Sequence, residues 1–350
     1  MNLGSDGLLV PRDAVALLAD PAAQASTDVR SRLGEVAALF ADDLARIEER
    51  LLAATRQGMA PSTDAAQHLL AAGGKRVRPL TVLLSAAVFG QAAGVAATVE
   101  LGAVSELIHL ATLLHDDVLD DGLERRGQPT SRRLWGNAVS VLAGDLLLTH
   151  ALERTSRVGI SDVMEDLFRT LRRLVDGEVV QLRGRTQLDP SEETYFYVAR
   201  NKTASLFGWA ARAGVRAAGA SASEAQTMGT FGEELGIAFQ LVDDAIDYEG
   251  DTGKTKLGDL REGKLTLPLL RTLATRPELL RDVEAVRAGD DGEPVERLLV
   301  AVRAGTGCRD TRQLAKLHTE RCLEALAAAP AGPARDLLAS VARELTGRGR

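Results

Sequence analysis

Two short acidic clusters with identical spacing are the residues of this chain best suited to do chemistry. They are "DDVLD", with Asp116, Asp117 and Asp120, and "DDAID", with Asp243, Asp244 and Asp247. On a helix, positions i and i+4 lie one turn apart on the same face, so the first and last aspartates of each cluster point the same way. Such carboxylates repel one another until a hard cation binds them, and oxygen ligands suit Mg²⁺ or Mn²⁺. Because Mg²⁺ prefers to complete its shell with phosphate oxygens, the clusters predict a metal-bridged phosphate ligand.

Each acidic cluster follows an apolar stretch, "ELIHLATLLH" or "ELGIAFQLV", that would carry it to the rim of a cavity. One DDxxD alone is typical of a solvated acidic face, whereas two copies behind apolar half-helices favour a cation site. Two other motifs are excluded. "DYEGDTGKTKLGD" lacks the glycine and the closing glutamate of an EF-hand loop, and "GDTGKT" lacks the glycine that a P-loop has five residues before Gly253.

Basic residues near both acidic clusters could meet the charge of a phosphate ligand. They are Lys75, Arg76 and Arg78 in "GGKRVRP", Arg125 and Arg126 in "ERRGQPT", Lys202 in "NKTASLF", and Lys254 and Lys264 in "GKTKLGDLREGKLTLP". Most of these stretches contain glycine, which lets backbone amides approach an anion. His109 lies seven residues before Asp116 and points to the same side of a helix. Position alone leaves open whether this histidine is a core residue or an anion ligand.

The composition of the 350 residues predicts an all-α protein. Hydrophobic residues make up 45% of the chain, charged residues 26% and aromatic residues only 3%, with much Ala, Leu, Arg and Glu. The net charge of −7 excludes non-specific nucleic-acid binding, which needs clustered positive charge. Cys308 and Cys322 have neither disulfide nor zinc spacing, which predicts reduced thiols. No basic leader and no transmembrane segment is recognised, so a cytoplasmic protein is expected.

The sequence predicts one domain with a short N-terminal extension. Residues 1–30 mix Pro, Gly and Asp with short apolar groups and predict a loosely ordered N-terminal extension. From residue 31 to residue 350, helical periodicity predicts a single all-α domain, beginning with a stripe that includes Phe40, Leu44, Ile47 and Leu51. The part after about Pro277 predicts short amphipathic helices that serve as scaffold.

Taken together, the motifs resemble those of the trans-isoprenyl diphosphate synthases, the polyprenyl synthetase family, and most of all its long-chain enzymes. "GGKRVRP", "ELIHLATLLHDDVLD", "RRGQPT", "GEVVQL", "NKTASLF", "FQLVDDAIDY" and "GKLTLPLL" follow the family's order over residues 70–270. The resemblance implies a single bundle of long helices around a deep cavity, a homodimer, and a prenyltransferase that joins isopentenyl diphosphate to an allylic diphosphate. It also implies three Mg²⁺ ions: two on Asp116, Asp117 and Asp120, and one on Asp243, with Asp244 and Asp247 in support.

The same resemblance assigns residues to the two substrates and to product length. It implies that isopentenyl diphosphate binds Lys75, Arg78, His109 and Arg126. It implies that the allylic diphosphate binds Arg125, Lys202, Thr203, Gln240, Lys254 and Lys264. In the family, bulky aromatics four or five residues before the first aspartate close the cavity floor. Here these positions are Thr112 and Ala111, so a product longer than farnesyl diphosphate is expected. Either Ile108 or residues on neighbouring helices would then close the shaft, the part of the cavity below Asp116 that holds the growing chain.

Three alternatives compete with a long-chain synthase. A short-chain synthase would make farnesyl or geranylgeranyl diphosphate by the same chemistry. The small residues at positions 111 and 112 argue against farnesyl diphosphate as the product and less strongly against geranylgeranyl diphosphate. A class I terpene cyclase would replace the second cluster by a motif with Asn, Ser or Thr and Glu, and would need more aromatics. A non-catalytic partner subunit would be expected to lose one acidic cluster or the "GGKRVRP" loop, and this chain keeps all of them.

Overall fold

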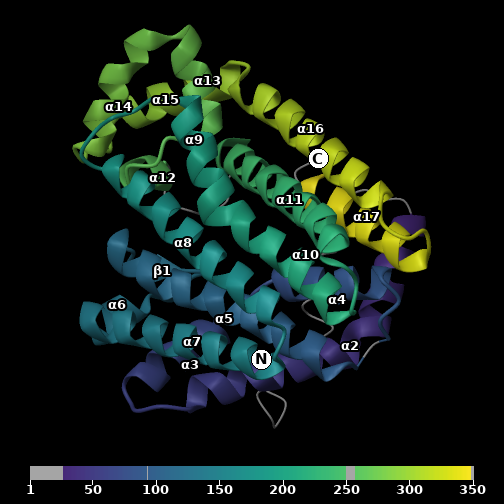
Figure 1. The fold of residues 1–350 in the computed structure, drawn as a ribbon. Helices are drawn as coiled ribbons and strands as arrows, with labels where there is room; N and C mark the ends of the chain where they lie inside the picture. Colours follow the sequence, from purple (N-terminus) through teal and green to yellow (C-terminus); the bar gives the residue numbers. More distant parts are fainter. Residues whose placement is uncertain (1–26, 93, 250–256, 348–350) are drawn as a thin grey trace.

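The computed structural model describes residues 27–92, 94–249 and 257–347, with side chains from Phe40 onward, and these residues form an all-α bundle (Figure 1). The helices are α2 (Thr27–Arg56), α3 (Ser62–Ala71), α4 (Val77–Val88), α5 (Ala96–Leu119), α6 (Ser131–Trp135), α7 (Asn137–Val158), α8 (Ser161–Arg183), α9 (Glu192–Val198), the π-helix η1 (Ala199–Ala204), α10 (Ser205–Ala217), α11 (Ala222–Glu249), α12 (Gly258–Arg261), α13 (Leu267–Thr275), the 3₁₀ turn η2 (Pro277–Leu279), α14 (Leu280–Arg287), α15 (Glu293–Ala304), α16 (Gly307–Ala327) and α17 (Pro333–Thr346). The predicted fold class is confirmed.

Helix α5 lies at the centre of the bundle. It contacts α2, α4, α7 and α10, and Leu101, Leu107, Leu110 and Leu114 on it are fully buried. Burying a leucine side chain stabilises a fold by about 1.5–3 kcal/mol, so α5 is firmly anchored. By length and composition it is the one helix in the described ranges apolar enough to cross a membrane, and 72% of that apolar window is buried inside the protein.

A small β-hairpin follows α5 and was not predicted from the sequence. Strands β1 (Glu124–Arg125) and β2 (Gln128–Pro129) pair antiparallel, with Arg125 opposite Gln128. The two loop residues, Arg126 and Gly127, have φ angles of 53° and 73°. Two positive φ values in a two-residue loop match the twist of the flanking strands. The hairpin thereby holds Arg125 and Arg126 beside the end of α5.

The C-terminal part differs from its prediction. From Pro277 onward, η2, α14 and α15 are short, whereas α16 is 21 residues long and packs along α11, as the yellow and green helices show in Figure 1. Helix α17 adds Leu338, Val341 and Leu345 to the main core. These helices support α11, which carries the second acidic cluster, so the scaffold role predicted for this part is consistent with their position.

One face of the bundle exposes apolar side chains. On α8, Phe168, Val175, Val179 and Leu182 recur at helical spacing and are 40–60% exposed, and Val141 and Leu142 are exposed on the adjacent α7. We call these six residues the α7/α8 apolar face. Exposed apolar residues grouped on one side commonly mark an association surface.

Candidate active site

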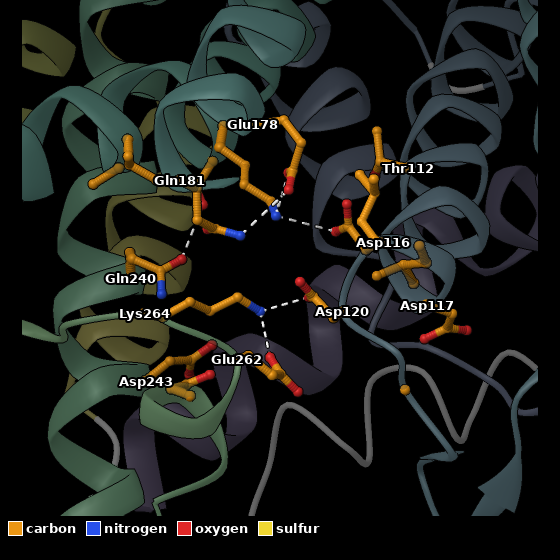
Figure 2. Close-up of a pocket in the computed structure, with 18 of the residues that line it drawn as sticks. Thr112, Asp116, Asp117, Asp120, Glu178, Gln181, Gln240, Asp243, Glu262 and Lys264 are labelled. Atoms are coloured by element: carbon orange, nitrogen blue, oxygen red, sulfur yellow. Dashed lines mark hydrogen bonds and ion pairs between the residues drawn. The ribbon is translucent and has the colours of Figure 1, made fainter. Parts of the chain in front are cut away.

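A cavity of about 2140 Å³ brings the sequence-predicted residues together. Its wall comes mainly from α5, α8, η1 and α11, together with the loops before α4 and after α5. In Figure 2, Asp116, Asp117 and Asp120 lie on one side of an open space and Asp243 and Gln240 on the other. Ligand pockets for drug-sized molecules typically measure about 300–1,000 Å³, so this cavity can hold a much longer ligand.

The first acidic cluster ends α5, and each of its carboxylates meets a cation of the chain. Asp117 is buried and accepts from Arg125 at 2.8 Å. Burial raises the pKa of Asp117, and the charge of Arg125 opposes that rise. Asp116 lies 3.4 Å from the ammonium of Lys202. Cations of the chain therefore partly neutralise this carboxylate cluster.

Asp120 is held by two cations at once. Its Oδ1 accepts from Arg185 Nη2 at 2.9 Å, and its Oδ2 accepts from Lys264 Nζ at 2.7 Å. Lys264 also donates to Glu262 at 2.5 Å, as the dashed lines of Figure 2 show. Burial opposes ionisation of Lys264, but Asp120 and Glu262 outweigh it and raise the pKa of this lysine. Lys264 is therefore a permanent positive charge at the cavity wall.

The second acidic cluster divides between the cavity and the protein interior. Asp243 and Asp247 are partly exposed in the wall, whereas Asp244 is buried. Tyr195 donates to Asp244 Oδ2 at 2.6 Å, and Gln240 donates to Asp244 Oδ1 at 2.8 Å. Burial raises the pKa of Asp244 to about 7. Because both of its oxygens are engaged, Asp244 fits the supporting role expected of it.

The π-helix η1 presents Lys202 and Thr203 to the cavity. It passes between two glycines, Gly177 on α8 and Gly236 on α11: a Cβ on Gly177 would lie 2.8 Å from the Lys202 nitrogen, and one on Gly236 would lie 2.6 Å from Ala204 Cα. Only glycine permits such close backbone approach. Lys202 then reaches Asp116 and Glu178, and Thr203 donates to Gln240 at 2.9 Å. π-helical turns occur frequently at functional sites.

Arg78, in the first turn of α4, is a basic residue of the cavity wall with a buried donor atom. Arg78 Nε is buried, and among the described residues it has no hydrogen-bond partner; the guanidinium stacks on the Phe207 ring at 4.7 Å. Burial lowers the pKa of Arg78, and Glu106 and Asp243 oppose that change. Lys75 and Arg126 are exposed at the mouth of the same cavity. A buried guanidinium Nε without a hydrogen-bond partner among the described residues points to an anionic ligand.

His109 is neutral in this setting. Burial, followed by the charges of Arg78, Arg126 and Arg125, lowers its pKa well below the ordinary value of 6.5. A neutral imidazole can still donate one N–H to a phosphate oxygen, so the position is compatible with the anion-binding role that the resemblance implies.

The depressed pKa predicts how folding stability depends on pH. The unfolded chain protonates His109 near pH 6.5 while the folded chain does not, so stability is full above that value and decreases as the pH falls below it. Without metal or substrate, wild type should lose about 1 kcal/mol more than His109→Asn between about pH 7.5 and pH 5.5. Urea unfolding of both proteins at the two pH values measures these losses in the free energy of unfolding. The contributions of the other histidines are the same in both proteins and cancel in the difference. Equal losses would show that His109 titrates normally.

The carboxylates fit a magnesium site of a particular kind. Within the described ranges, no three Asp, Glu, His or Cys side chains converge closely enough to hold a metal ion by themselves. Carboxylates on opposite walls of one cavity instead suit ions that take part of their shell from a phosphate ligand, which is the coordination that Mg²⁺ prefers. Asp116, Asp117, Asp120 and Asp243 would hold such ions.

Of the three residues predicted to control product length, only one lines the cavity. Thr112 lines the cavity, one turn below Asp116, but Ala111 and Ile108 are buried and are not among the residues that line it. The roles of these two therefore remain predictions. Lys254, predicted to bind the allylic diphosphate, lies outside the described residues. All other predicted site residues line the cavity.

Sequence reasoning missed three residues of the cavity lining, Glu178, Glu262 and Tyr195, and also Arg185, which lies outside that lining but pairs with Asp120. Glu178 binds Lys202, Arg185 binds Asp120, Glu262 binds Lys264 and Tyr195 binds Asp244. Of these residues, only Glu178 could have been recognised from the sequence as a site residue, because it lies in the motif "GEVVQL" with Gln181 one turn further on. The others belong to segments whose proximity arises only from the fold.

Comparisons with known proteins agree with this site. The polyprenyl synthetase family model matches residues 61–301. Octaprenyl diphosphate synthase of Escherichia coli (strain K12) is 35% identical over 323 residues, covering 91% of this chain and 99% of that protein. Nonaprenyl diphosphate synthase of Mycobacterium tuberculosis (strain ATCC 25618 / H37Rv) is 37% identical over 304 residues, covering 85% and 90%.

A solved structure also aligns with this chain over most of its length. The polyprenyl synthase from Caulobacter crescentus CB15, complexed with calcium and isoprenyl diphosphate, aligns with a TM-score of 0.83 at 35% identity, covering 89% of this chain and 97% of that one. The family match spans more than half of the chain, and the relatives align over nearly their whole length. The chain therefore belongs to the polyprenyl synthetase family.

Proposed function

We propose that this protein is a Mg²⁺-dependent trans-polyprenyl diphosphate synthase that condenses isopentenyl diphosphate with an allylic diphosphate to make a product longer than farnesyl diphosphate. The observation that carries this proposal is the placement of two acidic clusters on opposite walls of one large cavity, next to Arg78, whose buried Nε has no hydrogen-bond partner among the described residues. The long-chain synthases among its relatives support the same reaction.

The residues divide into two diphosphate sites. Isopentenyl diphosphate binds Lys75, Arg78, His109 and Arg126, and the allylic diphosphate binds Arg125, Lys202, Thr203, Gln240, Lys254 and Lys264. Asp116, Asp117 and Asp120 hold two Mg²⁺ ions and Asp243 holds a third, which, when bound, neutralise the diphosphate that leaves. Lys202 and Lys264 add fixed positive charge where the negative charge of the leaving group develops. No protein base is assigned to the final proton, which the departing diphosphate takes up.

The cavity itself favours a long product. Its volume is about 2140 Å³, and besides Thr112 its lining includes the apolar residues Leu174, Leu206 and Phe207. Apolar walls hold a growing prenyl chain and keep water from the allylic cation. A geranylgeranyl diphosphate synthase is the alternative if a side chain below Thr112 stops the chain early.

Filling the shaft should shorten the product. Thr112→Phe places an aromatic ring in the cavity wall below Asp116, so product should accumulate at farnesyl or geranylgeranyl length with turnover retained. Ala111→Phe, the change that the sequence favours, should shorten the product less because Ala111 is buried outside the lining. Chromatography of dephosphorylated products measures both. An unchanged product distribution for Thr112→Phe would show that the chain grows elsewhere.

Association and location complete the proposal. The α7/α8 apolar face suits pairing with a second copy, because Val141, Val175, Val179 and Leu182 on it would leave water on association. The protein is then a homodimer, with the cavity beside the interface. A cytoplasmic location is part of the same proposal, supported by two cysteines that are buried and unpaired with each other in the described structure.

The decisive test uses purified protein with Mg²⁺, labelled isopentenyl diphosphate and, separately, dimethylallyl, farnesyl or geranylgeranyl diphosphate. Products that extend well beyond geranylgeranyl are expected with at least one starter, and none should form when EDTA replaces Mg²⁺. A product series that ends at geranylgeranyl would support the short-chain alternative. Folded protein that gives no product with any starter would contradict the proposal and favour a non-catalytic partner subunit.

A further inference from the structure

Arg76 is a buried arginine that neither substrate assignment uses. It stands between Lys75 and Arg78, yet its side chain is only 4% exposed, whereas Lys75 is exposed in the cavity. The guanidinium contacts Glu48 of α2 twice, Nε to Oε1 at 2.5 Å and Nη2 to Oε2 at 3.1 Å, and Nη1 donates to Glu106 of α5 at 3.0 Å. Its charge is thus satisfied by the protein, in contrast to that of Arg78.

The backbone at Arg76 is unusual. Its φ of 49° and ψ of 34° lie in the left-handed region, which disfavours residues with a Cβ atom. Helix α4 begins at the next residue, Val77, and Arg78 follows in its first turn. The turn at Arg76 therefore sets the angle between Lys75 and Arg78. Such conformations persist when surrounding contacts fix them, and here two carboxylates from different helices do so.

The loop packs closely on this ion pair network. A Cβ on Gly74 would lie 2.4 Å from Arg76 Nη1, 3.3 Å from Arg126 Nη1 and 3.4 Å from Glu106 Oε1. The backbone of the loop thus lies against the guanidinium of Arg76, and Arg126 of the hairpin reaches the same point. Any displacement of Arg76 would disturb both segments that bring basic residues to the cavity.

We propose that Arg76 is a positioning residue for the isopentenyl diphosphate site, because its ion pairs with Glu48 and Glu106 fix the left-handed turn that directs Lys75 and Arg78 into the cavity. This inference rests on the proposed assignment of those two residues to isopentenyl diphosphate. It separates two roles within "GGKRVRP": Lys75 and Arg78 bind, and Arg76 holds them in place.

The test uses Arg76→Gly and Arg76→Lys. Glycine adopts the left-handed turn freely but has no ion pairs, and lysine keeps one charge but cannot bridge two carboxylates. Both variants should raise KM for isopentenyl diphosphate about tenfold or more while KM for the allylic substrate changes by about twofold or less. Glu48→Gln, on α2 and outside the cavity lining, should raise the same KM by a smaller factor.

Controls separate positioning from general destabilisation and from failure of the site assignment. Arg154→Lys alters another partly buried ion pair, to Glu100 at 2.5 Å, and should leave both KM values unchanged. Wild-type KM values in Arg76→Gly, or a fall in kcat that merely follows the loss of folded protein, would overturn the inference. Arg78→Lys tests the assignment: if it raises KM for isopentenyl diphosphate while Arg76→Gly does not, only the inference fails. If neither variant changes that KM, the assignment fails as well.

Discussion

Replacing Asp116 by asparagine is expected to lower kcat by about 10³-fold, because one carboxylate charge is lost where the metal ions and the departing diphosphate meet. The change keeps the size of the side chain, and Asp116 lies at the wall, partly exposed, so the fold should persist. Initial rates at saturating Mg²⁺ and both substrates measure the effect. The same measurement at increasing Mg²⁺ should recover part of the activity, since a weakened ion site is filled by mass action.

Asp121→Asn is the matched control for this prediction. Asp121 follows Asp120 directly, but its side chain is 74% exposed and pairs with Arg132 rather than with a residue of the cavity. Asparagine tolerates its positive φ of 53°. The control should retain wild-type kcat. A similar loss in both variants would mean that general acidity, rather than the spacing of the cluster, is what the reaction needs.

Lys202→Met is expected to lower kcat/KM for the allylic substrate by about 10²–10³-fold, with a much smaller change in KM for isopentenyl diphosphate. Methionine keeps most of the length of the side chain and removes its charge. The charge matters because Lys202 faces Asp116 and Glu178 at the cavity wall, where the allylic diphosphate is proposed to leave. Steady-state kinetics with each substrate varied in turn measure the two effects separately.

The control for Lys202 is Lys316→Met, the same substitution at an exposed position of α16 that is not part of the cavity lining. It should leave both kinetic constants unchanged. Unchanged kcat/KM for the allylic substrate in Lys202→Met, or a KM for isopentenyl diphosphate that rises as much as the allylic KM, would contradict the assignment of this lysine to the allylic site.

The sequence was sufficient to predict the fold class and the helices that carry the two acidic clusters. Helical periodicity depends on local geometry alone, so these helices could be predicted, and α5, which ends one residue before Asp120, and α11 confirm them. The partners of these carboxylates could not be predicted. Asp120 meets Arg185 and Lys264, which are 65 and 144 residues away, and no local pattern marks a contact of that kind.

Three other differences between the sequence-based prediction and the structure have local causes. The π-helix at Ala199–Ala204 changes the direction of Lys202 relative to an α-helical expectation, and glycines on two other helices leave room for its backbone. The hairpin that holds Arg125 and Arg126 is only two residues long in each strand, too short to give an alternating pattern. Ala111 lies about 140° from the direction of Asp116 on an ideal helix, which accounts for its burial outside the cavity wall.

The position of the first acidic cluster at the C-terminal end of α5 has a further consequence. The peptide dipoles of a helix sum to about half a negative charge at that end, so carboxylates there are destabilising by about 0.3–1 kcal/mol each. Asp116 and Asp117 lie in the last turn of α5, and Asp120 caps it. The final turn of the most deeply anchored helix is thus its electrostatically weakest part, held by Lys264 and Arg185. Metal ions that bind there would also stabilise this helix end, so metal binding and local order at the end of α5 should rise together.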